Sequence, residues 1–330
     1  MLCCPDKFRG SLTASEAAAA MCRGVGRAGF EARPLPLADG GEGTLAAILD
    51  SSPGTLLTAS VTGPDGDPVE ADWAVLGDGT AVIEMARASG LALVERNDPL
   101  TASTAGTGEL IAAAIARGCR RVIVGVGGSA TVDGGLGALD ALGWSLGEAE
   151  VLVACDVTTT FLAAPALFGP QKGASPADVA ALEERLAELA PRLRTARGLD
   201  IVALSGSGAA GGLAGGLAAI GARLVPGFDV VAEAVGFPAA LAECSAVITG
   251  EGRVDVSTLS GKVVARVLGA ARDLGRPAAV VAGRIERGVE LGVPARALAD
   301  MSRGDSFEEA AFLVEEAAFS LTLELPAPSR

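Results

Sequence analysis

The sequence contains no histidine, no tyrosine and only three lysines among its 26 basic residues. Without histidine, a zinc site would need cysteine and carboxylate ligands alone, and a proton acceptor would be a carboxylate or a lysine. The six cysteines form no C-x-x-C pair. Scattered cysteines of this kind are typical of reduced cytosolic proteins, where they pack as small hydrophobic residues. We therefore expect a cytoplasmic protein.

Positive charge is also scarce, with 26 basic against 40 acidic residues and a formal net charge of −14. No basic run offsets this charge, so nucleic acid is not an expected partner. Charged residues at Asp6, Lys7 and Arg9 interrupt the apolar run that a signal peptide has, so we expect no signal peptide. The longest uncharged run, 201–222, could span a bilayer in length but holds seven glycines. It favours a buried helix with a glycine-rich entry, and no membrane partner is expected.

Apolar runs alternate with helix-like patterns along most of the 330 residues, which predicts an α/β protein with mostly parallel sheet. Capping patterns at Thr13 and Ser175 predict helices over 13–27 and from 175 to near Pro191. A first set of strands is expected to form one five-stranded parallel sheet: 2–4, 32–37, 246–249, 278–282 and 296–299.

The sequence pattern changes between residues 56 and 86, where turn residues separate short β-rich segments. This pattern predicts a hairpin or meander that begins an inserted domain, to which strands 121–126 and 151–155 would also belong. We expect a discontinuous first domain of residues 1–55 and 230–330, with 56–229 inserted as a second α/β domain. Ligands commonly bind in clefts between domains, so the site is expected there.

The glycine-rich turn VGVGGSATVDGG spans residues 124–135 and follows an apolar run. Its spacing Gly125-x-Gly127-x-x-Ala130 loosely fits a dinucleotide fingerprint, which keeps a nicotinamide-dependent oxidoreductase as a minor alternative. The acid of that fingerprint lies about 20 residues on, whereas Asp156 lies farther along the chain. Successive N–H groups in this turn would suit a phosphate or a carboxylate equally.

The three lysines each lie in a short motif rich in turn residues: Lys7 in PDKFRG, Lys172 in GPQKGA and Lys262 in LSGK. A compact point charge beside flexible backbone suits phosphate binding. LSGK is not a Walker A motif, because Val256 and Val263 stand where glycine and serine or threonine are required. Phosphoryl transfer would therefore need a different fold.

Several acids follow strand-like runs in glycine-rich settings, at the strand ends where open α/β sheets bind ligands. Carboxylates there, with lysines and glycine turns, predict a Mg²⁺–phosphate site. Positioning and charge neutralisation dominate phosphoryl transfer, so histidine is not required. These acids are Asp39, Glu42, Asp133, Asp156, Glu251 and Asp255.

Eight ordered blocks resemble the class I glycerate kinases and cover nearly the whole chain. They are PDKFRGSLTASEAA (5–18), LADGGEGT (37–44), GTGELIAAA (106–114), GVGGSATVDGGLGAL (125–139), ACDV (154–157), FGPQKGA (168–174), GAAGGL (208–213) and VITGEGRVD…TLSGK (247–262). The resemblance implies an ATP- and Mg²⁺-dependent kinase that phosphorylates D-glycerate to 2- or 3-phosphoglycerate. It also implies a flavodoxin-like parallel-sheet domain with a second α/β domain inserted into it, and it allows a homodimer.

The resemblance also implies roles for individual residues. For the catalytic base, our hypothesis places Asp156 first and Asp255 second. Asp255 is otherwise expected to hold the metal, together with Glu251. Lys172 and Lys262 complete the catalytic set. The residues expected to bind substrate or nucleotide are Asp6, Arg9, Asp39, Glu42, Gly127, Gly128, Ser129, Thr131, Glu251 and Arg253.

The sequence departs from the family pattern in several places, two of them segments. Residues 158–164 read TTTFLAA where the family has Asn-Pro-Leu and a glycine-containing segment, and 144–150 is shortened. These departures leave a non-catalytic relative that binds glycerate or nucleotide as an alternative to an active kinase.

Overall fold

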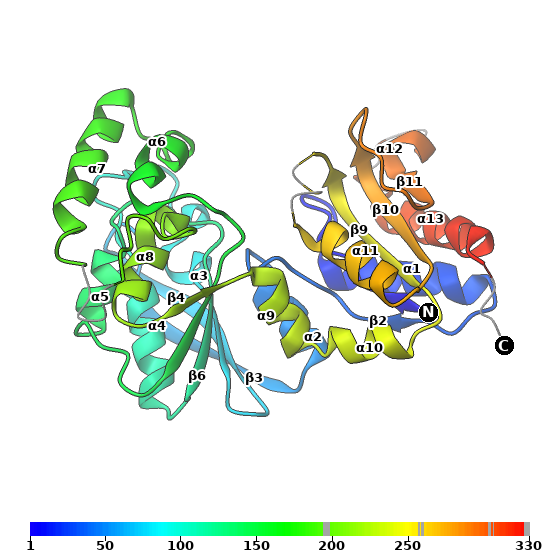
Figure 1. Cartoon of the computed structure of the whole chain (residues 1–330), viewed down its shortest axis with the longest axis horizontal. Helices are drawn as coiled ribbons and strands as arrows, with labels where there is room; N and C mark the ends of the chain where they lie inside the picture. The colour runs from blue at the N-terminus through cyan, green and yellow to red at the C-terminus, as the bar shows by residue number, and fades with distance from the viewer. Residues whose placement is uncertain (194–198, 257, 259–260, 303–304, 306, 327–330) are drawn as a thin grey trace. The chain divides into compact units, whose positions relative to one another are not determined.

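The computed structural model describes the chain except for residues 194–198, 257, 259–260, 303–304, 306 and 327–330. The fold is α/β, as predicted, and it divides into two compact units (Figure 1). The first unit comprises Met1–Asp39, Ala46–Ser52 and Val231–Arg330, and the second comprises Gly40–Leu45 and Pro53–Val230. The domain boundaries expected from the sequence stay a prediction.

The first unit contains a five-stranded sheet in the order β11-β10-β9-β1-β2, and all its strand pairs are parallel. This confirms the predicted parallel sheet. Read from the other edge, the order is 2-1-3-4-5, which is the flavodoxin-like order. The strands are β1 (Leu2–Cys3), β2 (Arg33–Pro34), β9 (Val247–Val254), β10 (Ala278–Ile285) and β11 (Ala295–Ala297).

In the described part of the chain, five helices belong wholly to the first unit, and α1 packs against α13 (Figure 1). They are α1 (Ala14–Arg27), α10 (Phe237–Glu243), α11 (Val263–Asp273), α12 (Leu298–Met301) and α13 (Ala310–Glu324). The division between the units runs through two further helices, α2 (Thr44–Ser51) and α9 (Gly227–Ala234).

Strand β2 is shorter than the predicted span 32–37. Pro34 and Pro36 have no N–H to donate, but β2 is an edge strand, where proline is tolerated at positions that do not donate to the neighbouring strand. The intervening residues still pair, because the N–H groups of Leu35 and Leu37 donate to the carbonyl oxygens of Cys3 and Pro5 at 2.8 and 2.9 Å. The chain therefore stays alongside β1 up to the loop that carries Asp39.

The second unit contains a six-stranded sheet in the order β3-β4-β5-β6-β7-β8. The first three strands pair antiparallel, which confirms the meander, and β5 to β8 pair parallel. Strand β8 was not expected from the sequence. The strands are β3 (Gly54–Thr62), β4 (Pro68–Leu76), β5 (Ala81–Glu84), β6 (Arg121–Gly125), β7 (Glu150–Ala154) and β8 (Arg223–Val225).

The helices of the second unit are short apart from two. The α-helices are α3 (Ala86–Ser89), α4 (Ala105–Ala116), α5 (Leu136–Ala141), α6 (Ala164–Phe168), α7 (Pro176–Leu189) and α8 (Leu213–Ala219). The 3₁₀ turns are η1 (Leu91–Leu93), η2 (Phe161–Ala163), η3 (Pro170–Lys172) and η4 (Ala209–Gly212).

Both predicted helix starts are confirmed as capping boxes. Thr13 caps α1 and its N–H donates to the Glu16 carboxylate at 2.9 Å, while Ser175 caps α7 and its N–H donates to Asp178 at 2.8 Å. Such caps satisfy N–H groups that the first helical turn leaves open. In each helix the serine or threonine therefore fixes where the helix begins.

The uncharged run 201–222 forms the buried helix α8 after a glycine-rich entry, as expected. Among the residues that the structure describes, no helix combines the length and apolar character needed to cross a bilayer.

Candidate functional site

The candidate residues fall into two sets, one in each unit. The first unit holds Asp6, Arg9, Asp39, Glu251, Arg253, Asp255 and Lys262, and the second holds Glu42, Gly127, Gly128, Ser129, Thr131, Asp156 and Lys172.

Asp6 follows β1, the strand beside β9 at the centre of the first sheet. Its N–H donates to the Gly250 carbonyl at 2.8 Å, and its carboxylate accepts from the Lys7 N–H at 2.7 Å. Burial, followed by the nearby carboxylate of Asp39, raises the pKa of Asp6 to about 7. Flavodoxin-like sheets bind ligands at this switch point between the first and third strands. We call Asp6, Asp39 and Glu251 the acid cluster.

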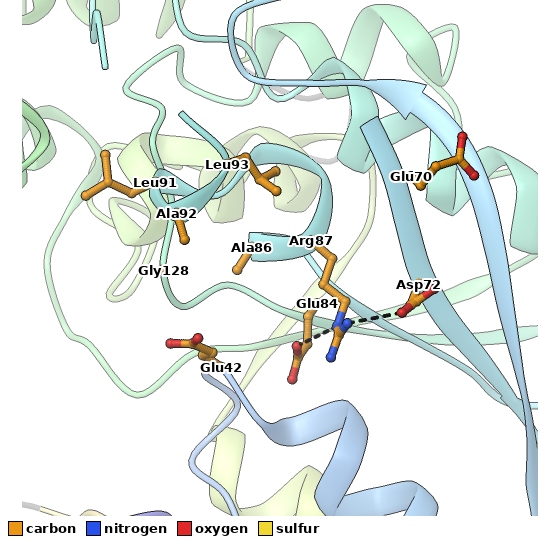
Figure 2. A pocket seen from close by; sticks show the side chains of 10 residues that line it. All are labelled: Glu42, Glu70, Asp72, Glu84, Ala86, Arg87, Leu91, Ala92, Leu93 and Gly128. Atoms are coloured by element: carbon orange, nitrogen blue, oxygen red, sulfur yellow. Dashed lines mark hydrogen bonds and ion pairs between the residues drawn. The ribbon is translucent and has the colours of Figure 1, made fainter. Parts of the chain in front are cut away.

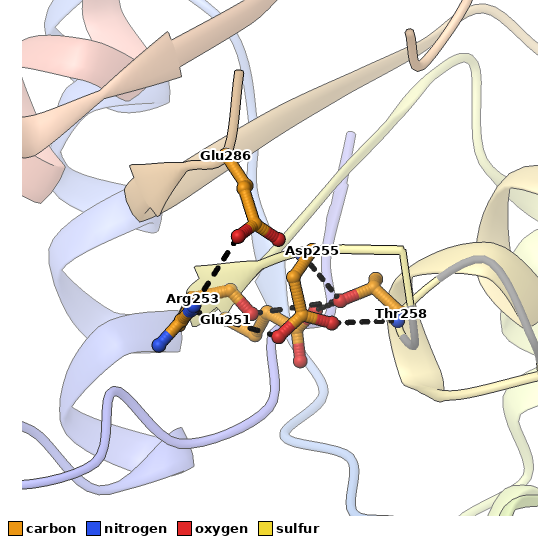
Figure 3. A network of polar contacts seen from close by, with 5 residues as sticks. All are labelled: Glu251, Arg253, Asp255, Thr258 and Glu286. Atoms are coloured by element: carbon orange, nitrogen blue, oxygen red, sulfur yellow. Dashed lines mark hydrogen bonds and ion pairs between the residues drawn. The ribbon is translucent and has the colours of Figure 1, made fainter. Parts of the chain in front are cut away.

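Glu251 lies in β9 and is buried. Burial raises the pKa of Glu251, against the opposing effects of the Thr258 hydroxyl and the Lys262 ammonium. Thr258 donates to Glu251 at 2.5 Å, and its N–H donates to the Asp255 side chain at 3.3 Å (Figure 3). Thr258 was missed from the sequence, although the spacing Asp255-x-x-Thr258 is that of a local turn in which each residue bonds the other.

Two basic residues flank this region. Arg253 is exposed and its guanidinium lies 3.6 Å from Asp255 and 3.5 Å from Glu286 (Figure 3). Arg9 is also exposed, and its backbone lies so close to Gly252 that a Cβ on that glycine would be 2.9 Å from the Arg9 nitrogen. Glycine at 252 is therefore needed for the strand to pass the loop after β1.

The donor chemistry of Glu251 and Asp255 fits a hard cation. Both offer carboxylate oxygens, and Mg²⁺ is commonly held by one or two carboxylates together with substrate phosphates and waters. Within the described residues, no three histidine, cysteine or acidic side chains converge closely enough to hold a metal ion by themselves. Such a cation would therefore depend on oxygens from a bound substrate or water.

The glycine-rich turn of the second unit follows β6. Gly128 has a φ of +74°, and a Cβ on Gly127 would lie 2.7 Å from the Cα of Gly41. In the described part of the chain, the N–H groups of Gly127, Gly128 and Ser129 donate no hydrogen bond. The next helix, α5, begins only at Leu136. A dinucleotide turn opens directly into its helix, so the geometry favours an anion cradle over the nicotinamide alternative.

Lys172 lies against this turn, with only 4% of its surface exposed. Its Nζ donates to Ser129 Oγ at 2.6 Å and to the Thr131 carbonyl at 2.7 Å. Burial lowers the pKa of Lys172 to about 8, although the carboxylate of Asp133 opposes this. The Thr131 hydroxyl is buried without a partner among the described residues. The turn is thus built around a buried positive charge.

Two further residues anchor the turn. Asn97 donates its side-chain amide to the carbonyls of Ala130 and Lys172 at 2.9 and 2.8 Å. The carboxylate of Asp133 accepts from four donors: the N–H and hydroxyl of Thr104 and the N–H groups of Gly135 and Gly137. Asp133, the acid in TVDGG, therefore anchors the backbone around the turn.

Asp156 follows β7 and is exposed, and its Oδ1 accepts from the N–H of Gly227 at 2.8 Å. Gly227 is the first residue of α9, so this contact satisfies one N–H of that helix. The departing segment 158–164 places Phe161 fully buried in the core. The residues after Asp156 are therefore anchored by packing.

Glu42 lines a cavity of about 560 Å³ in the second unit (Figure 2). Arg87 in this cavity forms ion pairs with Glu84 and Asp72, at 3.1 and 3.4 Å. With Glu70, the lining carries four carboxylates and one guanidinium. Gly128 of the glycine-rich turn also lines this cavity, so the carboxylates and one end of the turn border the same space.

The comparisons with known proteins cover most of the chain. The Glycerate kinase family matches residues 1–150 and 145–322. Glycerate 2-kinase of Escherichia coli strain K12 is 39% identical, covering 85% of this chain and 84% of that protein. Glycerate kinase of Bacillus subtilis strain 168 is 41% identical, covering 86% and 84%.

A crystal structure described as a candidate glycerate kinase 2 from Salmonella typhimurium LT2 is also similar. Its TM-score is 0.84 at 34% identity, and the match covers 98% of this chain and 97% of that one. Because sequence and fold agree along nearly the whole length, this kinase belongs to the glycerate kinase family.

Proposed function

We propose that the protein transfers the γ-phosphoryl group of ATP to a hydroxyl of D-glycerate, giving phosphoglycerate and ADP with the assistance of Mg²⁺. The observation that carries the proposal is the glycine-rich turn with Lys172 against it, within a chain of this family. Buried cations and unpaired N–H groups are what a transferred phosphoryl group or an acceptor carboxylate requires. The name of the Escherichia coli relative favours oxygen 2 of glycerate as the acceptor.

In this reaction the acceptor hydroxyl oxygen forms a bond to the γ-phosphorus, and the bond from that phosphorus to the ADP oxygen breaks. The hydroxyl proton passes to a carboxylate, for which we propose Asp156, with Asp255 as the second candidate. Asp255 and Glu251 would hold Mg²⁺, which neutralises charge on the phosphate oxygens when it is bound. Lys262, at the N-cap position of α11, would face the same charge.

The remaining candidates are proposed to bind the two substrates. Gly127, Gly128, Ser129 and Thr131 would hold an anionic group, and Arg9 and Arg253 are exposed cations suited to phosphate or carboxylate. Asp6, Asp39 and Glu42 supply acceptors for hydroxyl groups.

The oxidation state of the cysteines supports a cytoplasmic location, which we also propose. All six are free thiols in the structure, which suits a reducing compartment. The homodimer allowed by the resemblance stays a prediction.

The test is ADP release by the purified protein with ATP, Mg²⁺ and D-glycerate, followed by phosphorus NMR of the product. We expect ADP and one phosphoglycerate, and the coupling of its phosphorus to carbon-bound hydrogens identifies the oxygen. The proposal fails if no ADP appears while D-glycerate or ATP still raises the melting temperature, because the chain would then be a binding protein without turnover.

A further inference from the structure

Lys172 is a buried cation without a partner of opposite charge. It ends η3 (Pro170–Lys172), and in the described part of the chain no carboxylate forms an ion pair with its ammonium. Buried charges are ordinarily paired, because desolvation of an unpaired charge is costly. The placement therefore costs stability and calls for a reason other than folding.

Asp133 is the acid that acts on Lys172 electrostatically. Its carboxylate oxygens, however, already accept hydrogen bonds from Thr104, Gly135 and Gly137. The positive charge of Lys172 is consequently only partly balanced within the second unit, and it remains available to a ligand.

The contact between Lys172 and Ser129 fixes the direction of one proton. An ammonium donates and never accepts, so Ser129 Oγ must accept in the 2.6 Å bond. The hydroxyl hydrogen of Ser129 then points away from Lys172, and among the described residues it has no acceptor. The neighbouring N–H groups of Gly127 and Gly128 are likewise undonated there. The Ser129 hydroxyl and the N–H groups of Gly127 and Gly128 are therefore donors that the turn can offer to a ligand.

We propose that Lys172 is a positioning residue: it holds Ser129 so that the serine hydroxyl donates to an anionic oxygen of a bound substrate. The charge of Lys172 strengthens that bond by polarising the hydroxyl. The inference rests on the proposed kinase function. The ligand atom is an oxygen of either a phosphate of ATP or the carboxylate of D-glycerate, and the two sources are separated by the test.

The test measures the affinities of Lys172→Met, Ser129→Ala and the double variant for ATP and for D-glycerate by calorimetry. Each single change should lower the affinity for the same one of the two ligands about tenfold or more. The double variant should be no more than about twofold weaker than the weaker single variant, because both changes remove one interaction. Multiplicative losses in the double variant, or unchanged affinities for both ligands, would overturn the proposal.

Two exposed positions of the second unit supply matched controls. Ser145→Ala removes a surface hydroxyl and Arg223→Met removes a surface charge that pairs with Glu150. Both should leave the affinities unchanged. The melting temperature of Lys172→Met should stay within about 4 °C of the wild type or exceed it, because an unpaired buried charge has been removed.

A pH series keeps the proposal testable if Lys172→Met does not fold. Because burial lowers the pKa of Lys172 to about 8, the wild-type affinity for the sensitive ligand should fall as the pH rises from 7 to 9. Ser129→Ala should show a much smaller fall, and an equal fall in both proteins would contradict the role of Ser129.

Calorimetry separates this inference from the proposed function, since it requires no turnover. A wild-type protein that binds ATP or D-glycerate but transfers no phosphoryl group would refute the function, while the affinities would still decide the role of Lys172. A wild-type protein that binds neither would overturn both.

Discussion

The acid cluster of the first unit and the glycine-rich turn of the second unit present opposite chemistry at the ends of parallel strands. In the first unit, the strand ends carry the acid cluster, where burial raises the pKa values of Asp6 and Glu251. In the second unit, the strand β6 ends in a turn of N–H donors against the buried Lys172. The first arrangement suits a cation and the second an anion. One fold class thus supplies both kinds of binding group through its loops.

The largest expected effect tests whether the second unit depends on close backbone contact. Gly211 has a φ of +65°, and a Cβ there would lie 2.0 Å from the Thr131 carbonyl oxygen. Gly211→Ala should therefore lower the free energy of unfolding by about 3 kcal/mol or more. The matched control is Gly236→Ala, which has a φ of +71° but open space around its Cβ, and it should cost about 1 kcal/mol. Equal losses in urea unfolding would show that φ alone matters.

The next effect concerns the proposed base in the second unit. Asp156→Asn should lower kcat about a hundredfold, because asparagine does not accept the hydroxyl proton. The melting temperature should hardly change, since asparagine also caps a helix and the bond to Gly227 can persist. Near-normal turnover in this variant would remove Asp156 as the base and leave Asp255.

A pH effect is expected in the acid cluster of the first unit. The pKa of Asp6 is raised from 3.8 to about 7 in the folded state. The wild-type protein should therefore lose stability as the pH rises from about 4 to 7, because the folded state gives up its proton less readily than the unfolded chain. An asparagine side chain does not titrate. Over this pH interval, the free energy of unfolding of Asp6→Asn should therefore rise by about 3 kcal/mol relative to that of the wild type.

Urea unfolding at pH 4, 5.5, 7 and 8 measures this difference. Asp273→Asn, at an exposed position on α11, is the control and should show a constant difference. If the difference in free energy of unfolding between Asp6→Asn and the wild type does not vary with pH, the pKa of Asp6 is not raised in the folded protein.

The smallest effect tests strain in the second unit. Ala210 has a φ of 53°, in the left-handed region that alanine rarely adopts. Ala210→Gly should raise the free energy of unfolding by about 0.5 kcal/mol, the balance of relieved strain and added chain entropy. Ala209→Gly should destabilise instead, and a loss in both variants would contradict the strain.

The sequence revealed local features better than distant ones. Each capping box, at Thr13 and at Ser175, depends on residues within a four-residue segment, and both are present. Strand β8 has only three residues and no alternating pattern, so it could be seen only from its pairing with β7. The shortness of β2, which has two residues, was likewise not visible in the sequence.

The candidate site shows the same division. Glycine spacing predicted a turn at 124–135 that binds an anion, whereas the contact between Lys172 and Ser129 joins residues 43 positions apart. Thr258 lies near its partner Asp255 in sequence, but its bond to Glu251 depends on the bend after β9. Tertiary packing decides which polar residues of a motif meet, and periodicity does not report it.

The most direct test of the contrast between the units is the Mg²⁺ concentration that half-activates glycerate phosphorylation, measured for the wild type, Glu251→Gln and Ser129→Ala. The account predicts that Glu251→Gln raises this concentration about tenfold or more, because a cation ligand is lost. Ser129→Ala should leave the half-activating Mg²⁺ concentration within about twofold of the wild-type value, while it lowers the affinity for ATP or D-glycerate. Equal shifts in the two variants, or no shift in Glu251→Gln, would contradict the assignment of cation binding to the first unit and anion binding to the second.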